Sequence, residues 1–287
     1  AVAFNGPDAT GPNTGHELRI FNNIIANNVA GTAGGGIALQ DVVNARIVHN
    51  TITHNDSTYT SAASFAPGNL VSTPQVAGLL VEALSPSLQS VVGATFVSPL
   101  IASNIIHSNR AYFYDYGANP PLQASPQQFI DLGVSGAGLP APLMSPRYCL
   151  LVDASPFPPA LGNVSGDPGF LGSVDNALLS AIVMDEGGNN ISVRFQPHLV
   201  AGANYHINAS SDAVDQGDNA TFGLFAELGE DFDRQGRKPP VDIGADERPA
   251  TNLSPVANDD KATTPVNTPV TIDVLANDTD PDGQLNP

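Results

Sequence analysis

A short pattern, Asn-x-Ile-x-x-Asn, occurs three times within residues 23–109 and limits the possible folds more than any other feature of the sequence. Its copies are Asn23-Ile25-Asn28, Asn50-Ile52-Asn55 and Asn104-Ile106-Asn109, so the second copy begins 27 positions after the first and the third begins 54 positions after the second. The shorter spacing suits one coil of a β-solenoid, in which short strands are joined by bends. The longer spacing, which is twice as large, predicts either two coils or one coil with a long excursion.

A second pattern accompanies the first. Apolar runs that follow glycine, Gly36-Ile37-Ala38-Leu39 and Gly78-Leu79-Leu80-Val81, precede the second and third copies. Each coil is therefore expected to hold a strand that begins at glycine and a strand centred on isoleucine, with Ile25, Ile52 and Ile106 stacked inside. Asparagine tolerates left-handed backbone angles and bonds to its neighbours, so we expect the repeated asparagines to form the bends and a hydrogen-bonded ladder.

Composition supports a mainly β chain. Glycine and proline number 27 and 25, tryptophan is absent and only 13% of residues are charged, which favours turns and strands over long helices. The formal charge of -18 disfavours nucleic acid and anionic lipid as partners, and it suits calcium, which takes oxygen ligands. The sequence has no apolar run long enough for a membrane span. Its single cysteine, Cys149, is expected to be a small buried apolar side chain rather than a reactive thiol.

Motifs in the last third of the chain carry a resemblance to a known family. They are DPGF at residues 167–170, YHI at 205–207, SDAVDQGD at 211–218, DFDRQGR at 231–237 and VDIGADE at 241–247. Together with the repeats, over residues 18–247, they resemble bacterial surface β-helix proteins of the choice-of-anchor Q type. The resemblance implies a right-handed parallel β-helix at the cell surface that ends at these motifs. The chain departs from the family at residues 208–212, where Asn-Ala-Ser-Ser-Asp stands in place of Gly-Ser-Pro.

The C-terminal residues carry a second resemblance. After a linker-like stretch at 249–255, the sequences VANDD at 256–260 and PVTIDVLANDTDPDG at 269–283 resemble the start of a cadherin-like tandem repeat of bacterial adhesins. Val270, Ile272 and Val274 alternate and predict one buried strand face. Residues 254–287 are too few to bury a sandwich core, so we expect either that the chain is a piece of a longer protein or that a strand from elsewhere completes this unit.

These patterns predict an all-β protein, a right-handed parallel β-helix with a C-terminal partial β-sandwich strand segment. We expect β-helix coils over residues 1–117 and a proline-rich excursion over 118–162. The end region of the β-helix is expected over 163–248, and a linker with an incomplete cadherin-like repeat over 249–287.

Two groups of carboxylates are candidate sites. Asp278, Asp280 and Asp282 alternate before Gly283, the arrangement of an oxygen-liganded calcium loop, and Asp259 or Asp260 would complete an inter-repeat site. A solvated acidic turn is the alternative for this group. A second group surrounds Arg234, Arg237 and Lys238 and is expected to seal the end of the β-helix by ion pairs, with a metal site as the alternative; its acids are Asp231, Asp233, Asp242, Asp246 and Glu247. The six histidines show no zinc spacing and are expected to be surface or ladder residues.

The sequence favours a non-catalytic extracellular structural or adhesive module of a secreted bacterial surface protein. One specific form is a filament subunit linked by strand addition from the C-terminal tail, so the expected partners are other copies of the chain or neighbouring repeats, and glycans are a further candidate ligand. The enzymatic alternative is a polysaccharide lyase or glycoside hydrolase acting in the β-helix groove. Its basic candidates are Arg46 and Arg110, the nearest acids are Asp41 and Asp115, and Asp41 with Glu82 is the candidate hydrolytic pair.

Overall fold

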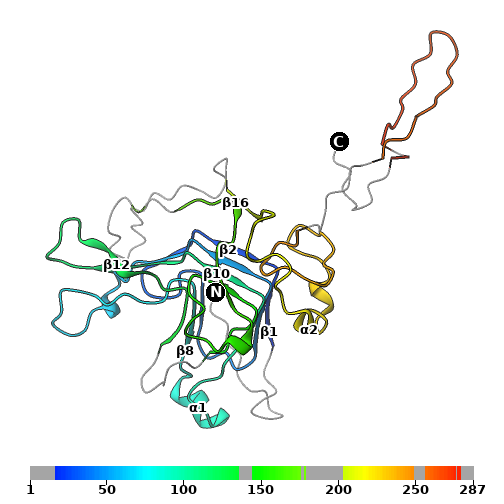
Figure 1. Cartoon of the computed structure of the whole chain (residues 1–287). Coiled ribbons are helices and arrows are strands. Elements are labelled where there is room, and N and C mark those ends of the chain that lie inside the picture. The colour runs from blue at the N-terminus through cyan, green and yellow to red at the C-terminus, as the bar shows by residue number, and fades with distance from the viewer. Residues whose placement is uncertain are drawn as a thin grey trace. The chain divides into compact units, whose positions relative to one another are not determined.

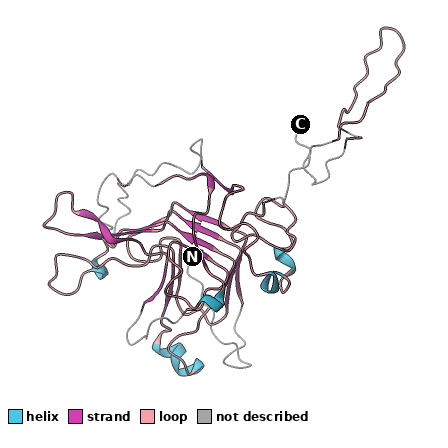
Figure 2. Ribbon diagram, in the orientation of Figure 1, coloured by secondary structure: helices cyan, strands magenta, loops and turns pink. Residues whose placement is uncertain are grey.

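The computed structural model describes residues 17–135, 144–175, 178, 203–248, 256–275 and 277–278. The chain forms two compact units, Ala1–Glu247 and Arg248–Pro287 (Figure 1). The regular secondary structure of the described chain is mostly β, with a few short helices, and loops join these elements (Figure 2). Among these residues no helix is long and apolar enough to cross a membrane.

Four ladders of strands run through the described part of the larger unit, and each takes one strand from successive repeats of the chain. The first ladder contains β1 (Leu18–Phe21), β5 (Ala45–Val48) and β9 (Leu100–Ala102). The second contains β2 (Ile24–Ala26), β6 (Thr51–Thr53), β10 (Ile105–His107), β14 (Leu150–Leu151) and β15 (Val164–Ser165). The third contains β3 (Val29–Ala30), β7 (Asp56–Ser57) and β11 (Arg110–Tyr114), and the fourth contains β4 (Ile37–Leu39), β8 (Leu79–Glu82) and β13 (Leu132–Ser135). All these pairings are parallel; only β12 (Leu122–Phe129), which joins β11, is antiparallel.

The register of the second ladder follows the repeated motif. Ile25 pairs with Ile52, and Ile52 pairs with Ile106, so equivalent positions stack directly. Ile52 and Ile106 are fully buried in the main core, and Ile25 packs against it from the first repeat, which confirms the predicted stacking. Because β6 pairs directly with β10, the longer interval between the second and third motifs holds one repeat with two excursions, at residues 58–78 and 83–99. The second excursion carries α1 (Pro86–Val92).

The glycine just before the fourth strand of a repeat is required by a close backbone approach. A Cβ atom at Gly78 would lie 2.2 Å from the carbonyl oxygen of Asp131, in the next repeat. Real side chains do not approach a carbonyl oxygen so closely, so only glycine lets the two segments pack at this distance.

The bends between strands differ in one respect from the sequence prediction. We expected the repeated asparagines to adopt left-handed angles, and this is wrong: the residue before each asparagine does so. These preceding residues have φ angles between 52° and 59°; they are Asn22, Asn27, His49, His54, Ser103 and Ser108. The repeated asparagine is thereby turned inward, where its amide can bond to the backbone and to the next asparagine.

Residues 118–162, which we expected to be an excursion, contribute to the ladders as well. This range contains β13 and β14, which extend the fourth and second ladders although they lack the Asn-x-Ile-x-x-Asn motif. Pro146 lies between these two strands, where it removes no ladder hydrogen bond. The range also holds the short helix η2 (Pro159–Leu161).

The first excursion and the hairpin of β11 and β12 together form an arm, which we define as residues 58–78 and 110–129. The amide of Ser72 donates to the carbonyl of Tyr114 (2.9 Å), and the amide of Tyr116 donates to the carbonyl of Leu70 (3.0 Å). The rings of Tyr114 and Tyr116 are 4.9 Å apart, and Phe65, which follows η1 (Ala62–Ser64), lies 5.6 Å from Tyr116. The arm projects from the body at the left of Figure 1. It exposes 65% of Leu70 and 58% of Tyr116.

Residues 203–247, which we call the closing segment, pack against the outside of the first two ladders. The segment contains β17 (Asn204–Ile207), which pairs antiparallel with β16 (Phe170–Gly172), and the helices α2 (Asn219–Phe222) and η3 (Ala226–Leu228). Gly244 donates its amide to the carbonyl of Ser103 (2.9 Å), and Ala245 donates to the hydroxyl of Thr51 (3.1 Å). Gly244 has a φ of 108°, and a Cβ there would lie 2.7 Å from Ile105, so both its conformation and its contact require glycine.

The smaller unit is described for residues 256–275 and 277–278. We expected Val270, Ile272 and Val274 to form a buried strand face, and this is wrong for the described residues, because no strand is found there and these side chains are 49%, 44% and 59% exposed. The described part of this unit supplies no second layer of apolar side chains against which a strand face could be buried. This agrees with the expectation that so short a stretch cannot bury a sandwich core.

Candidate metal centre

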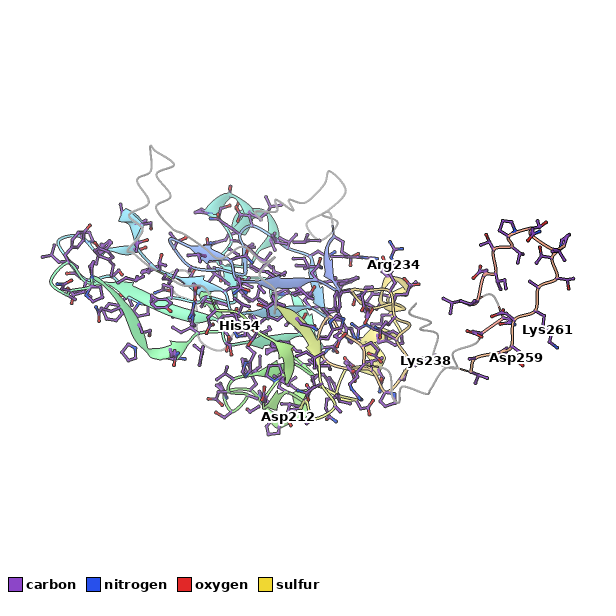
Figure 3. All side chains as sticks on the ribbon, turned by 90° about the horizontal axis from the view of Figure 1, so that it is seen from above. His54, Asp212, Arg234, Lys238, Asp259 and Lys261 are labelled. Atoms are coloured by element: carbon purple, nitrogen blue, oxygen red, sulfur yellow. The ribbon has the colours of Figure 1, made fainter. Side chains whose placement is uncertain are left out.

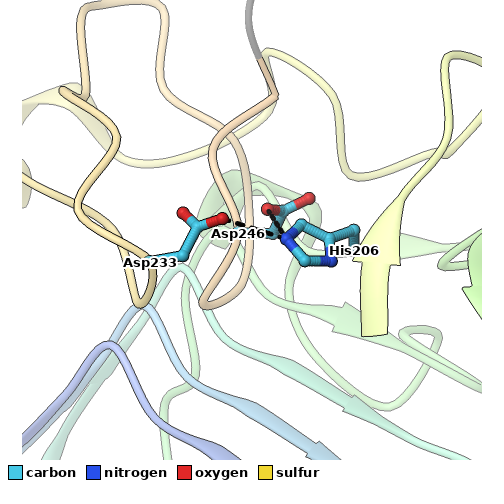
Figure 4. A group of neighbouring side chains, drawn as sticks. All are labelled: His206, Asp233 and Asp246. Atoms are coloured by element: carbon cyan, nitrogen blue, oxygen red, sulfur yellow. Dashed lines mark hydrogen bonds and ion pairs between the residues drawn. The ribbon is translucent and has the colours of Figure 1, made fainter. Parts of the chain in front are cut away.

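The closing segment brings one histidine and two aspartates together (Figure 4). Nε2 of His206 lies 3.0 Å from Oδ2 of Asp233 and 4.0 Å from Oδ1 of Asp246, and the three side chains offer ligand atoms that all lie within 4.8 Å of one another. Imidazole nitrogen and carboxylate oxygen are both common metal ligands. This is the group of His, Cys, Asp and Glu side chains among the described residues whose spacing could hold a metal ion.

Each member of the group is held by a different part of the segment. His206 lies on β17, and its imidazole ring lies 4.9 Å from the ring of Phe232. Oδ2 of Asp246 accepts the amide of Ile207 (2.8 Å), which fixes this carboxylate beside β17. Asp246 is almost fully buried, and this burial raises the pKa of its carboxyl group.

Asp233 is positioned by a second carboxylate, that of Asp231. Oδ1 of Asp231 accepts the amides of Asp233 (3.1 Å) and Gln235 (2.8 Å), and its Oδ2 accepts the amide of Glu247 (3.0 Å). Burial raises the pKa of Asp231 to about 6. Asp231 therefore shapes the loop that presents Asp233 and ties this loop to the end of the segment.

A buried ion pair lies in the same segment. Nη1 of Arg237 donates to Oε2 of Glu247 (2.9 Å), while its Nη2 donates to the carbonyls of Gly244 (2.9 Å) and Ala245 (2.8 Å). Burial lowers the pKa of Arg237 and raises that of Glu247 to about 7. The predicted internal ion pairing is confirmed for this pair.

The acidic group that the sequence suggested is therefore divided between several roles. Asp233 and Asp246 face His206, Asp231 binds backbone amides, and Asp242 accepts the amide of Asp215. Arg234 and Lys238 are exposed at the surface of the larger unit (Figure 3).

The sequence prediction missed His206, because this residue lies far before Asp233 in the chain and nothing in the local pattern marks the contact. The YHI motif at residues 205–207, which precedes the two acidic motifs in the sequence, was the available signal.

The residues of the enzymatic alternative are placed in several parts of the larger unit. Arg110 is bound in two places by one carboxylate, with its Nε 2.7 Å and its Nη2 2.8 Å from the oxygens of Asp56. Asp175 lies 3.5 Å from the same guanidinium, and Arg46 pairs with Glu17 at 2.7 Å. Asp56 was missed, although it lies one repeat before Arg110 and pairs with it in the third ladder. The spacing between the second and third motifs would have found it.

The candidate acids also differ in their surroundings. Oδ1 of Asp41 accepts the amide of Ser85 (2.6 Å), and burial and the charge of Asp41 raise the pKa of Glu82. Asp115 lies in the arm, where its Oδ1 accepts the amide of Gly117 (2.8 Å) in a turn. The fold therefore brings Asp41 and Glu82 together and places Asp115 in the arm.

The calcium candidates lie in the smaller unit. Oδ1 of Asp278 accepts the amide of Asn258 (2.7 Å), which brings Asp278 beside the segment that carries Asp259 and Asp260. Asp280 and Asp282 lie outside the described residues. The calcium site stays a prediction.

Comparison with known proteins gives one family match. Residues 252–286 match the model of a bacterial Ig domain, so an Ig-like repeat lies near the C-terminus. No curated protein and no solved structure matches the chain. A bacterial Ig-like domain suggests a surface or extracellular structural module.

Proposed function

We propose that this chain is a non-catalytic structural module of a bacterial surface protein, in which a right-handed parallel β-helix of the choice-of-anchor Q type precedes an Ig-like repeat. The Ig-like match at residues 252–286 supports an extracellular setting. In the first three ladders, the parallel pairs among the first three repeats join residues 27 or 54 positions apart, which supports a β-helix as the architecture of the larger unit.

The observation that carries this proposal is the use of the repeated polar residues. Oδ1 of Asn50 accepts from the amide and the side chain of Asn23, and the side chain of Asn50 in turn donates to Oδ1 of Asn104 (3.0 Å). A second row runs in the same way and ends on a carboxylate; its members are Asn28, Asn55, Asn109 and Asp131. The asparagines of the second and third repeats thus bond to backbone and to one another inside the protein instead of meeting a ligand, as a stiff spacer requires.

The adhesive part of the proposal concerns the arm. Its exposed Leu70 and Tyr116 offer apolar surface beside the buried ring of Tyr114, and such a surface suits contacts with other copies of the chain or with glycans. A filament linked by strand addition from the C-terminal tail is the specific form that we favour, since residues 270–274 combine apolar alternation with exposure. Calcium bound by Asp278, Asp280 and Asp282 with Asp259 or Asp260 would stiffen this unit.

Electron microscopy and light scattering of the purified chain test this proposal, with and without a calcium chelator. We expect elongated particles or end-to-end fibres, and fibres should disappear when Val270 and Ile272 are both changed to Asp. The matched control is Val256 with Val266 changed to Asp, because these two valines are exposed in the same unit outside the predicted strand. Fibres that tolerate the first double variant would exclude strand addition by this segment, and compact particles without repeats of density would exclude the spacer.

The second candidate function is glycoside hydrolysis, and one observation favours it. The pKa of Glu82 is raised beside Asp41, as is usual for a general acid that works with a second carboxylate. Polysaccharide lysis fits less well, because the pairing of Arg110 with Asp56 favours the protonated guanidinium, which cannot act as a base. Release of reducing ends from acidic and neutral polysaccharides separates these functions from the structural one, and a hydrolase must lose that release in Glu82→Gln but keep it in Glu227→Gln.

A further inference from the structure

The hydrogen bonds of His206 show which of its ring nitrogens carries a proton. Oδ1 of Asn204 lies 3.1 Å from the backbone nitrogen of His206 and 2.6 Å from Nδ1 of the same residue. A backbone N–H can only donate, so the atom that it faces is the amide oxygen, and Nδ1 must carry a proton to bond to the same oxygen. The position of the proton on Nδ1 leaves Nε2 as the nitrogen that is free to accept or to bind a cation.

Nε2 of His206 faces carboxylate oxygens. Its nearest neighbours in the group are Oδ2 of Asp233 and Oδ1 of Asp246, at 3.0 and 4.0 Å. Three atoms that all present lone pairs repel one another unless a cation lies between them, either a proton on Nε2 or a metal ion. The distance of 4.0 Å to Asp246 is too long for a hydrogen bond. A proton on Nε2 would therefore bond to Asp233 and would make no hydrogen bond to Asp246.

The ligand set selects the kind of metal. Calcium and magnesium prefer oxygen ligands throughout, whereas one imidazole and two carboxylates suit zinc and similar divalent transition metals. Bonds of about 2.0–2.2 Å in a tetrahedral site place ligand atoms roughly 3.4 Å apart. The observed separations of 3.0 and 4.0 Å lie on either side of this value, so small side-chain rotations would complete the site.

The surroundings supply the outer contacts that such sites use. Metal-binding histidines donate their second ring N–H to an oxygen, as Nδ1 of His206 does to Asn204. Oδ2 of Asp246 is bound by the amide of Ile207, and Oδ2 of Asp233 accepts from the side chain of Gln235 (3.2 Å). The three ligands are thus oriented before any metal binds, and Asp233 lies on the exposed side, from which an ion can enter.

We propose that His206, Asp233 and Asp246 bind one divalent transition-metal ion, with zinc as the best fit, through three protein ligands and a water molecule. The ion would join β17, the loop at residues 231–237 and the end of the closing segment at residues 241–247. It would thereby stabilise the closing segment against the ladders. This inference goes beyond the proposed function and does not depend on it, because a structural metal could serve a spacer or an enzyme.

The test uses the full chain, stripped of metal by a chelator and dialysed, with zinc ions alone as the probe. Calorimetric titration and elemental analysis should give one zinc per chain at micromolar affinity or better, and cobalt should give the visible absorption of a tetrahedral site. His206→Gln and Asp233→Asn should each weaken binding by about tenfold or more, a loss of the size that removing a supporting contact already causes. His107→Gln is the matched control, because it removes a half-buried histidine outside the group and should leave zinc binding unchanged.

Thermal unfolding provides the second measurement. Zinc should raise the midpoint of the wild-type chain and of His107→Gln, and it should not raise that of His206→Gln. If His206→Gln does not fold, Asp233→Asn decides the question, since Asp233 is exposed and its removal disturbs no core. Equal zinc binding by wild-type chain and Asp233→Asn, or no binding at micromolar zinc, would overturn the proposal and leave the group as an ion pair only.

Discussion

The asparagine rows make Asn50 the most informative residue to change. Its Nδ2 donates to the carbonyls of Ile20 (2.7 Å) and Val48 (3.1 Å) and to Oδ1 of Asn104 (3.0 Å). Its Oδ1 accepts the amide (3.0 Å) and the side chain (3.1 Å) of Asn23. Asn50 is fully buried, so no water can replace these contacts in the folded state.

The expected loss of stability for Asn50→Ala follows from these contacts. A hydrogen bond contributes about 1 kcal/mol net, and a buried group left without a partner costs about 1–3 kcal/mol. The side-chain contacts of Asn50 therefore predict a decrease in the free energy of unfolding of about 3–5 kcal/mol. The loss is not larger, because some of the bonded groups keep another hydrogen-bond partner. This change would remove a large share of the stability of an ordinary domain.

The matched control is Asn28→Ala. Asn28 belongs to the other row, is exposed, and donates from its side chain to Ala26 (3.2 Å) and Asn55 (2.9 Å). Its replacement should cost about 1 kcal/mol, because the exposed side chain of Asn28 donates only these two hydrogen bonds and Oδ1 of Asn55 keeps the bond from the backbone amide of residue 28 (3.0 Å). Urea unfolding followed by far-ultraviolet circular dichroism measures both variants at equal slope. If Asn50→Ala loses no more stability than Asn28→Ala, the buried row is not what stabilises the repeats.

Three further predictions concern buried ionisable groups. Burial raises the pKa of Asp131 to about 7, above its unfolded value of about 4, so its contribution to stability is complete below about pH 4 and is lost as the pH rises through about 7. Asp131→Asn should flatten this decrease in the free energy of unfolding, measured by urea titration, and should be more stable than the wild type by about 1–3 kcal/mol at pH 8. A gain that is equal at pH 4 and pH 8 would contradict the raised pKa. Cys149 is fully buried with a pKa of about 12, so a thiol reagent should label it only in denaturant, and labelling of the native chain would contradict the burial. Arg237→Ala should cost about 3–5 kcal/mol because it leaves Glu247 buried without its partner, whereas Lys238→Ala, an exposed control, should cost less than about 0.5 kcal/mol in the same urea assay.

Much of the larger unit follows from the period of the sequence. The spacing of the first two motifs places Ile25 on Ile52 and Asn23 on Asn50, and the structure has both pairs. The same reasoning could not identify β14, where Cys149 occupies the position of the repeated asparagine and donates its backbone amide to Oδ1 of Asn163 (3.0 Å). Pairing in a parallel ladder depends on backbone groups and apolar packing, so a strand can join without the motif that marks the others.

The second asparagine row shows a similar limit. Its last member is Asp131, which lies only 22 residues after Asn109. Oδ1 of Asp131 accepts hydrogen bonds from the backbone amide (2.8 Å) and the side chain (2.7 Å) of Asn109. The spacing breaks because the third repeat closes through the hairpin of β11 and β12 rather than through a regular bend. A carboxylate offers the same acceptor as an asparagine oxygen, so the row continues chemically where the period and the residue type both change.

The period of the repeats does not predict the contacts within the closing segment or those between this segment and the ladders. The contact of His206 with Asp233 and Asp246 was missed for this reason. The segment bonds to positions that the repeats leave open: Asp218 donates its amide to the hydroxyl of Ser103 (2.8 Å), and Ala245 donates to that of Thr51. These hydroxyls come from two different repeats, so the path of the segment is set by the stacked surface and not by its own pattern. His206 and Asp246 meet because β17 and the last motif both lie on that surface, and the hydrogen bond from Ile207 to Asp246 then fixes their distance. The geometry of this site therefore depends on the whole larger unit. A variant that removes hydrogen bonds from the asparagine rows, such as Asn50→Ala, should weaken zinc binding as well.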